Sequence, residues 1–362
     1  MLQPRPGVLE IAPYVGGKST AGGTAEPIKL SSNEAALGAS PRARAAFVEM
    51  GAKLHRYPDG GAVDLRAAIA RHHDLDATRI VCSAGSDELI SLLAKAYAGP
   101  GDEVLLSRHG FLMYPIAAHA AGATPVMAEE RNLTTDVDAL LARVTPATRI
   151  VFLANPNNPT GTYISTSEVR RLHAGLPDNV LLVLDAAYAE FVDAEDYEAG
   201  VRLVDSAENV IMLRTFSKLY GLAALRLGWG YGAPGIIDVL NRLRGPFNVS
   251  LPAQAAGVAA LDDTDFTARQ LAHNAEWRAW LSGRLNQLGL DVVPSVGNFI
   301  LVRFPDRDGQ RAPDADAFLI ARGILVRRME GYGLPGTLRI SIGTGPENEA
   351  LASALADFLR GA

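Results

Sequence analysis

Between residues 79 and 232, short apolar runs alternate with stretches of helical spacing, and this alternation restricts the possible folds more than any other feature. The run "EVLLS" (103–107) is typical, because apolar side chains follow one another instead of alternating with polar ones. A strand of this kind must be covered on both faces. We therefore expect an α/β fold with a mainly parallel sheet between helices. The predicted strands lie within 79–85, 103–107, 124–128, 149–154, 179–185, 209–216 and 226–232.

The composition and periodicity of the sequence change at two points, which divide the chain into three parts. Residues 1–30 are rich in Gly and Pro without clear periodicity, so we expect an N-terminal arm. Residues 31–250 are predicted to form a large domain, and residues 251–362 a smaller α+β domain. Ser86 is the expected N-cap of the first helix that follows a strand. Helices are expected within 86–98, 136–144, 167–176 and 267–288, and C-terminal strands within 298–304, 323–329 and 337–343.

The composition restricts the class of partner. Hydrophobic residues make up 48% of the chain and charged residues 20%, with a formal net charge of −6 and no basic block, so we expect no nucleic-acid partner. The single cysteine, Cys82, excludes an internal disulfide and suits a reducing compartment. No apolar run approaches the length of a signal peptide core or a membrane span, so we expect a cytoplasmic protein without a membrane partner.

Polar residues follow several predicted strands at their carboxyl ends, where open parallel sheets bind ligands. Gly85 and Ser86 precede a helix, and the backbone N–H groups there suit a phosphate, although Ser86 is equally suited to a structural cap. Thr215 and Ser217 add hydroxyls after a later strand. Arg226 either completes this anion site with charge-assisted bonds or is a surface charge at the end of a helix.

The remaining strand ends carry groups that suit a heterocyclic ring. Asp185 closes an apolar run, so it is expected to be buried beside a cation or several donors, unless it caps the next helix. Tyr188 follows three residues later. Asn158 lies in a proline-flanked turn and is either a turn residue or an amide that fixes a ring substituent. Lys218 follows another strand, where a solvated surface lysine is the simpler interpretation.

Taken together, these groups match pyridoxal 5′-phosphate, because its phosphate, pyridinium nitrogen, phenolic oxygen and aldehyde each find a counterpart. Lys218 is then expected to be the Schiff-base lysine and the group that shuttles a proton. Asp185 would keep the pyridine nitrogen protonated. Tyr188 and Asn158 would hold the phenolic oxygen.

Three motifs support this interpretation, namely "NPNNPTG" (155–161), "DAAYAEF" (185–191) and "TFSKLYGLAALRLGW" (215–229). Their order resembles that of the fold type I PLP-dependent aminotransferases of class I and II, and the resemblance covers nearly the whole chain. Further motifs resemble, more narrowly, the histidinol-phosphate aminotransferases. These are "PYVGGKS", "KLSSNEAALGASP", "HRYPDGG", "SAGSDELI" and "GILVRRMEGYGLPGTLRISIG".

The resemblance implies Lys218 as the catalytic residue and adds roles that the strand ends do not indicate. Phe111 matches an aromatic residue that stacks on the pyridine face, although it is equally well explained as a core residue. Tyr57 matches a tyrosine that reaches the cofactor phosphate of the partner subunit, which implies a homodimer with shared active sites. The substrate-binding positions implied by the resemblance are Tyr14, Asn33, Arg327 and Arg339.

The substrate implied by the narrower resemblance is an amino phosphate ester, with a 2-oxo acid as its partner. Arg327 and Arg339 offer planar guanidinium groups that suit a phosphate oxyanion. Side chains alternate along a strand, so at most one of Arg327 and Arg328 is expected to point inward. Two departures near the substrate end bear on the substrate. The chain has "NEAALG" (33–38) where the family often has "NENPLG", and Arg328 where the family often has proline.

Four functions follow from these observations. The first is transamination of L-histidinol phosphate with 2-oxoglutarate to imidazole acetol phosphate and glutamate, in histidine biosynthesis. The second is an aromatic amino-acid aminotransferase of broader specificity, and the third a PLP-dependent decarboxylase of an amino-acid phosphate. The fourth, a PLP-fold transcription regulator, would need a DNA-binding domain, for which about thirty N-terminal residues are too few.

Two other motifs are set aside. "GYGLPG" (331–336) matches a dinucleotide-binding pattern but lacks the strand–loop–helix context that such a site requires. His72 and His73 have no metal-binding partners at suitable spacing, so no metal site is expected.

Overall fold

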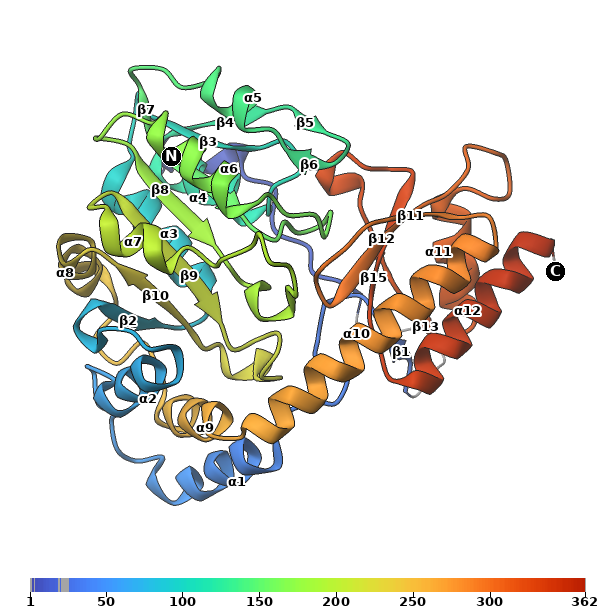
Figure 1. Ribbon diagram of the computed structural model, residues 1–362, viewed down its shortest axis with the longest axis horizontal. Helices are drawn as coiled ribbons and strands as arrows, with labels where there is room; N and C mark the ends of the chain where they lie inside the picture. Colours follow the sequence, from blue (N-terminus) through green and yellow to red (C-terminus); the bar gives the residue numbers. More distant parts are fainter. Residues whose placement is uncertain (1, 3, 19, 21–25, 362) are drawn as a thin grey trace.

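The structure, a computed structural model, describes residues 2, 4–18, 20 and 26–361. Parts of the predicted N-terminal arm, namely residues 1, 3, 19 and 21–25, therefore lie outside the described residues. The described chain forms a larger lobe and a smaller lobe, and the long helix α10 (Thr264–Gln287) runs from one to the other (Figure 1). The C-terminus lies at the far end of the smaller lobe (Figure 1).

A seven-stranded sheet forms the centre of the larger lobe in the described part of the chain. Its strands are parallel except β10, which runs antiparallel to both of its neighbours. The predicted mainly parallel sheet is therefore confirmed, and each strand lies within its predicted segment or extends it by one residue. In spatial order the strands are β2 (Ile80–Ser83), β10 (Gly228–Gly232), β9 (Val210–Thr215), β8 (Leu181–Asp185), β7 (Thr148–Ala154), β3 (Glu103–Ser107) and β4 (Thr124–Ala128).

Helices cover both faces of this sheet because both faces are apolar. In β8, Leu182 and Leu184 belong to one core cluster, whereas Leu181 and Val183 belong to another on the opposite face. The first cluster includes residues of α2 (Val63–His73), α5 (Val137–Leu141), α6 (Thr166–Ala174), α7 (Val201–Ser206) and α9 (Leu251–Leu261). The second includes residues of α3 (Ser86–Tyr97), α4 (Met113–Ala121) and α8 (Pro234–Leu243).

The smaller lobe contains an antiparallel sheet in the order β11 (Asp291–Val293), β12 (Phe299–Arg303), β15 (Thr337–Ser341) and β14 (Arg327–Arg328). Leu30, just after β1 (Ile28–Lys29), packs in its core with α10, α11 (Ala312–Ala321) and α12 (Gly345–Arg360). β1 pairs in parallel with β13 (Ile324–Leu325), so the end of the predicted arm joins the smaller lobe. The other described elements are β5 (Glu130–Arg131), β6 (Thr134–Thr135), α1 (Pro41–Glu49) and the 3₁₀ helices η1 (Val8–Glu10), η2 (Met50–Lys53), η3 (Ala77–Arg79), η4 (Ala189–Phe191), η5 (Ala223–Leu225) and η6 (Glu330–Tyr332).

The packing of α9 bears on the predicted domain boundary at residue 250. α9 packs against α1 and α2, and its buried residues Ala253, Ala256 and Ala260 belong to the core of the larger lobe. The placement of residues 251–261 in the small domain is therefore wrong, because this apolar helix is buried on the other lobe. We propose that the division lies near the start of α10.

Side-chain caps account for several helix starts. Asp136 accepts hydrogen bonds from two N–H groups of α5, and Ser165 and Ser250 each accept one at the starts of α6 and α9. The prediction of Ser86 as an N-cap is wrong. Gly85 caps α3 with φ 80° and ψ 157°, and Ser86 is the first helical residue. Only glycine adopts these dihedral angles without strain, and the sharp turn lets the helix begin directly after β2.

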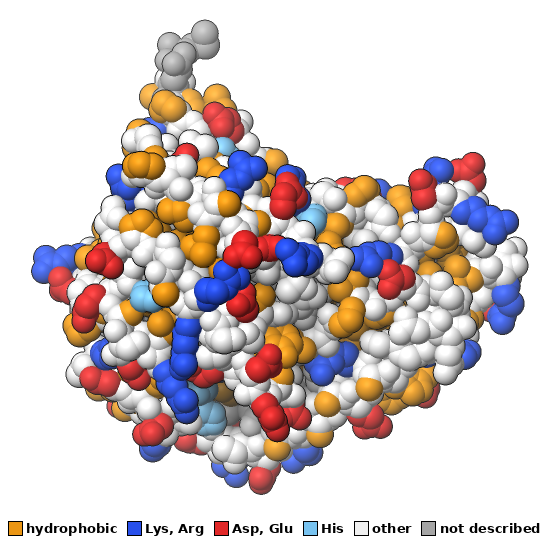
Figure 2. Space-filling model, turned by 45° about the horizontal axis from the view of Figure 1, so that its top comes forward, with side chains coloured by type: hydrophobic (Ala, Val, Ile, Leu, Met, Phe, Trp, Pro, Cys, Tyr) orange, Lys and Arg blue, Asp and Glu red, His pale blue; other side chains and the backbone are white. Residues whose placement is uncertain are grey.

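On the face shown in Figure 2, acidic and basic side chains are interspersed over the whole surface. Within residues 2, 4–18, 20 and 26–361, none of the helices has both the length and the apolar character needed to span a membrane.

Candidate active site

The carboxyl ends of β7, β8 and β9 and the start of α3 meet at one cavity of about 270 Å³, which the N-terminal arm and two strands of the smaller lobe also border. Two of the residues predicted for the site, Gly85 and Tyr57, do not line it. Gly85 lies just behind its wall, whereas Tyr57 is 82% exposed and its ring stacks on Phe247 at 4.7 Å. The predicted residues that line the cavity are Tyr14, Asn33, Ser86, Phe111, Asn158, Asp185, Tyr188, Thr215, Ser217, Lys218, Arg226, Arg327 and Arg339.

Lys218 follows β9 at the bottom of this cavity. Its amine donates a hydrogen bond to the carbonyl oxygen of Ser32 at 3.3 Å and lies 5.8 Å from the centre of the Tyr188 ring. Desolvation, helped by the positive charge of Arg339, lowers the pKa of Lys218 to about 8. A substantial share of the amine is therefore neutral near physiological pH, and the neutral form is the nucleophile. Lys218 is consequently suited to bond to a carbonyl carbon and to exchange protons.

Asp185 is the last residue of β8 and is buried beneath the cavity. The hydroxyl of Tyr114 donates to its Oδ2 at 2.7 Å, and the N–H of Ala187 donates to its Oδ1 at 3.2 Å. Burial raises the pKa of Asp185 to about 6, although both hydrogen bonds oppose this rise. The carboxylate is thus held in place by two donors and favours a cationic partner from the cavity side.

Tyr114 is a site residue that was not predicted from the sequence. It is completely buried in α4, and its ring stacks on Phe152 at 4.6 Å. The available signal was a tyrosine within an otherwise apolar helix, because a buried hydroxyl needs a hydrogen-bond partner. Phe111 precedes this helix and meets Tyr114 edge to face at 5.9 Å, so one side of Phe111 is packed while it also lines the cavity.

Tyr188 and Asn33 form a pair on the other side of the cavity. The amide of Asn33 donates to the Tyr188 hydroxyl at 2.9 Å, and the Asn33 backbone N–H donates to the Ser341 hydroxyl at 2.7 Å. Asn33 has φ 55°, a left-handed conformation that asparagine tolerates better than most residues. Burial raises the pKa of Tyr188 to about 12, so its phenol stays protonated and can donate a hydrogen bond into the cavity.

The start of α3 and the segment after β9 form an anion cradle. Arg226 donates from Nη1 to the hydroxyl of Ser217 at 3.4 Å and from Nη2 to Asp87 at 3.2 Å. A Cβ atom at position 85 would collide with the Arg226 guanidinium, so glycine allows this close approach. Arg226 itself has φ 51°, and strained residues of this kind cluster at functional sites. Asp87, which the sequence analysis did not single out, is the ion-pair partner of Arg226.

Two arginines from neighbouring strands of the smaller lobe also border the cavity. Arg327 in β14 is directly opposite Arg339 in β15. Arg339 donates to Asn158 Oδ1 at 2.5 Å and to the carbonyl oxygen of Ser31 at 3.0 Å. Arg327 donates to the carbonyl oxygen of Val15 at 2.9 Å and to the Tyr14 hydroxyl at 3.3 Å. Both guanidinium groups are thus held in place by neutral oxygens, and neither forms an ion pair with a carboxylate among the residues that the structure describes.

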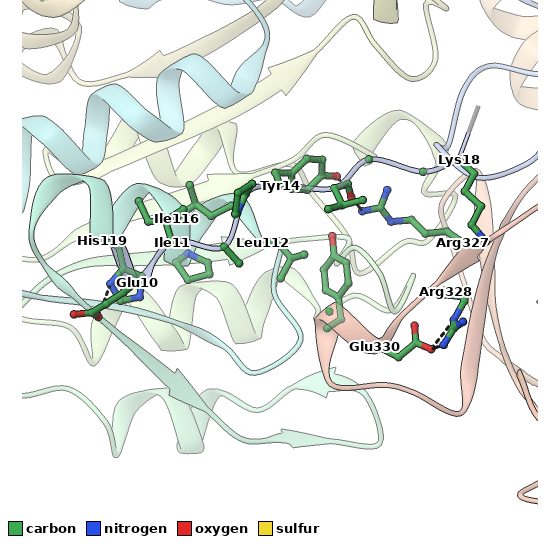
Figure 3. Close-up of a pocket in the computed structure, with 18 of the residues that line it drawn as sticks. Glu10, Ile11, Tyr14, Lys18, Leu112, Ile116, His119, Arg327, Arg328 and Glu330 are labelled. Carbon is green, nitrogen blue, oxygen red and sulfur yellow. Dashed lines mark hydrogen bonds and ion pairs between the residues drawn. The ribbon is translucent and has the colours of Figure 1, made fainter. Parts of the chain in front are cut away.

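Side chains alternate between the two faces of β14, so Arg327 and Arg328 point to opposite sides, as expected. Arg327 is buried, whereas Arg328 is exposed and forms an ion pair with Glu330 (Figure 3). Arg327 and Tyr14 also border a second cavity of about 570 Å³, which lies between the N-terminal arm and α4. Figure 3 shows Glu10 beside His119 at one end of that cavity and the Arg328–Glu330 pair at the other, with Ile11, Leu112 and Ile116 on its apolar part.

The donor set fits pyridoxal 5′-phosphate. A cradle closed by a glycine, an arginine and a helix start suits the phosphate, and a buried carboxylate suits the ring nitrogen. The Lys218 amine, this cradle and the two arginines of the smaller lobe all border the same cavity. No group of three or more His, Cys, Asp or Glu that could hold a metal ion occurs among the residues described.

Comparison with known proteins agrees with this geometry. The family model for aminotransferase class I and II matches residues 25–355. The chain is 59% identical to the histidinol-phosphate aminotransferase of Paramagnetospirillum magneticum, over 98% of each chain. It is 60% identical to that of Rhodospirillum centenum, over 99% of each. A crystal structure of the Sinorhizobium meliloti histidinol-phosphate aminotransferase with pyridoxal 5′-phosphate is similar, with a TM-score of 0.87 and 30% identity over 92% of this chain and 91% of that one.

Proposed function

The chain belongs to the class I and II aminotransferases, and from this we propose that it transfers the amino group of L-histidinol phosphate to 2-oxoglutarate. The products are imidazole acetol phosphate and glutamate, and the cofactor is pyridoxal 5′-phosphate. Relatives that are 59% and 60% identical over nearly the full length carry the name histidinol-phosphate aminotransferase, which supports this substrate.

One observation in the structure carries the proposal. Arg327 and Arg339 lie directly opposite each other on adjacent strands, and both border the cavity that contains the Lys218 amine. Two guanidinium groups side by side suit a phosphate monoester, which carries close to two negative charges at neutral pH. A substrate with a phosphate at one end and an amine a few bonds away therefore matches the two ends of the cavity.

When bound, pyridoxal 5′-phosphate supplies an aldehyde for the amino group and a ring that accepts electrons from the substrate carbon. We propose that Gly85, Ser86, Thr215, Ser217 and Arg226 hold its phosphate. Each of them lies at or directly behind the anion cradle of the cavity wall.

The ring has its own set of residues under this proposal. Asp185 keeps the ring nitrogen protonated, and Tyr114 and Ala187 hold its carboxylate in place. Tyr188 and Asn158 bind the phenolic oxygen, and Phe111 packs against the face of the ring. The buried carboxylate gains its missing cationic partner in this way.

Lys218 moves the proton. Its amine, with a pKa lowered to about 8, would take the proton from the substrate Cα and deliver it to the cofactor carbon that carried the aldehyde. Tyr14 and the arm that carries it cover Arg327, which limits the access of water to the phosphate end of the substrate. Asn33 orients Tyr188 through its amide and lies beside the substrate.

We also propose a homodimer with shared active sites. Tyr57 is 82% exposed and stacks on Phe247, which is itself 46% exposed, so an unusual aromatic surface is available for a second copy of the chain. In the dimer, Tyr57 reaches the cofactor phosphate of the partner. The proposed location is the cytoplasm, where a free thiol such as that of Cys82 stays reduced.

A single half-reaction tests the substrate. The purified enzyme loaded with pyridoxal 5′-phosphate is mixed with histidinol phosphate in the absence of a keto acid, and the visible absorption of the cofactor is followed. We expect the absorption of the starting form to disappear and to return when 2-oxoglutarate is added. A response to phenylalanine or tyrosine with none to histidinol phosphate would favour an aromatic aminotransferase instead. Release of carbon dioxide from an amino-acid phosphate would favour a decarboxylase.

A further inference from the structure

Two buried polar atoms of the smaller lobe, one of which belongs to an arginine that borders the active-site cavity, have no hydrogen-bond partner within the part of the chain that the structure describes. They are the hydroxyl oxygen of Tyr332 and the Nε atom of Arg339. Tyr332 is 5% exposed and Arg339 4%. Buried groups of this kind are normally paired, so an unpaired donor and an unpaired acceptor at one site need an explanation.

The backbone places these two residues on the same side of the small sheet. Tyr332 ends η6, in the connection between β14 and β15, and Arg339 lies in β15. Leu301 in β12 is directly opposite Arg339, so their side chains share one face of the sheet. Tyr332 packs in one apolar cluster with Leu301 and Met329, so its ring covers that same face. The phenol and the guanidinium therefore lie over the same face of the sheet, and in this structure no hydrogen bond joins the phenol oxygen to Nε.

The electrostatics agree with this placement. Burial raises the pKa of Tyr332 to about 12, and the Arg339 guanidinium is the charge that opposes this rise most strongly. The phenol is therefore neutral at physiological pH. A neutral phenol oxygen accepts a hydrogen bond from a guanidinium N–H.

The other donors of Arg339 show why the Nε atom matters. Nη1 donates to Asn158 and Nη2 donates to the carbonyl oxygen of Ser31, so both arms of the guanidinium are occupied by protein oxygens. Each Nη carries a second N–H, with which the guanidinium can bind an oxyanion of the substrate while it keeps its bonds to Asn158 and Ser31. The Nε–H is the remaining donor, and a partner for it would fix the guanidinium plane.

We propose that Tyr332 is a positioning residue for Arg339, whose phenol oxygen accepts the Nε–H while the two Nη atoms bind the substrate oxyanion. This inference rests on the proposed function, in which Arg339 binds a phosphate ester in one half-reaction and a dicarboxylic acid in the other. The motif "GYGLPG", which has no dinucleotide context, thereby acquires a role in this site.

The substitution Tyr332→Phe tests the proposal, because it removes the hydroxyl and keeps the ring that packs on Leu301. The enzyme loaded with pyridoxal 5′-phosphate is titrated separately with glutamate and with histidinol phosphate, and the rate of the absorption change is fitted for each. We expect the half-saturating concentration of both substrates to rise about tenfold and the limiting rate to stay within about twofold. The unfolding temperature should not fall, because the variant removes an unpaired hydroxyl.

Tyr231→Phe is the matched control. Its hydroxyl donates to Asp205 at 2.7 Å, at the end of β10 that points away from the active site, and its loss should leave both half-saturating concentrations unchanged. Unchanged values in Tyr332→Phe, or the same rise in the control, would overturn the proposal. A clear fall in the unfolding temperature of Tyr332→Phe would also overturn it, since the hydroxyl would then be structural.

Titration with two substrates distinguishes a failure of this proposal from a failure of the proposed substrate assignment. A wild-type enzyme that responds to glutamate but not to histidinol phosphate would contradict the proposed function. The glutamate titrations of the wild type and of Tyr332→Phe would still decide the role of Tyr332, because Arg339 borders the cavity whichever amino donor is used.

Discussion

The protonation state of Lys218 follows from its surroundings. Desolvation lowers its pKa from 10.5 to about 8, so between these values the unfolded chain binds more protons than the folded chain. The stability of the cofactor-free protein should therefore rise with pH across this window, and below pH 8 the cost of desolvating the charged amine is fully present. Lys218 is partly open to the cavity, so we expect a rise of about 1 to 2 kcal/mol instead of the full value of the shift.

Lys218→Ala removes this dependence. Denaturant unfolding of the cofactor-free wild type and of the variant, measured at intervals from pH 7.5 to pH 10.5, should give free energies that converge as the pH rises. Parallel curves for the two proteins would show that Lys218 is solvated in the folded chain. The same variant should retain pyridoxal 5′-phosphate without a covalent bond and lose turnover by about 10³-fold or more.

At this scale the sequence predicted well those residues that directly follow a strand. Asp185, Lys218 and Ser217 lie one or two positions beyond an apolar run, and the rule for parallel sheets is enough to bring them together. Tyr114 was missed because its partner Asp185 is 71 residues away, and no local pattern encodes such a contact. Tyr57 does not line the cavity of its own chain, so the role proposed for it would need a second copy.

The turn between β2 and α3 allows the role of one glycine to be tested. Gly85 has φ 80°, and a side chain there would also collide with Arg226. Gly85→Ala should cost about 2 kcal/mol of stability and weaken the binding of pyridoxal 5′-phosphate at least about tenfold. Fluorescence titration of the cofactor-free protein measures the affinity, and thermal unfolding measures the stability.

Gly101→Ala is the matched control, because Gly101 has φ 89° but open space around its Cα. It lies just before β3, at the end of the strand away from the active site. It should cost about 1 kcal/mol of stability and leave the cofactor affinity unchanged. If both variants lost the same affinity for pyridoxal 5′-phosphate, the collision with Arg226 would not be the cause of the weaker binding.

At the scale of elements, strands were easier to predict than helix starts and lobe boundaries. β3 and β4 match their predicted ranges because each contains a continuous apolar run, 104–106 in β3 and 125–128 in β4. The run at 323–329 instead breaks into β13 and β14, because its first half pairs with β1 and its second half with β15. The helix α9 could not be assigned to a lobe from its sequence, since alanine-rich helices pack equally well on any apolar surface.

At the scale of the whole molecule, the proposed homodimer with shared active sites predicts complementation between two defective chains. Lys218→Ala has no turnover, and Tyr57→Ala should bind pyridoxal 5′-phosphate about tenfold more weakly than the wild type does. In a mixed dimer, one site combines both defects and the other has neither. Co-expression of the two chains should therefore restore up to about a quarter of the wild-type activity at limiting cofactor.

The reference for this measurement is the sum of the activities of the two variants, each purified separately and assayed at the same limiting cofactor concentration. Activity of the co-expressed sample that does not exceed this sum, although mixed dimers are present, would show that Tyr57 serves its own chain or no site at all. Size-exclusion chromatography with light scattering establishes whether the chain is dimeric at the concentration of the assay.

The paired arginines of the smaller lobe have a practical consequence. Like charges directly opposite each other on adjacent strands destabilise a sheet, and here both are buried. Any small dianion in the medium supplies the missing counter-charge and binds the folded chain in preference to the unfolded one. Phosphate and sulfate buffers should thus protect the enzyme during storage and at the same time occupy the place of its substrate, so that the best preservative for this protein is also a poor assay medium.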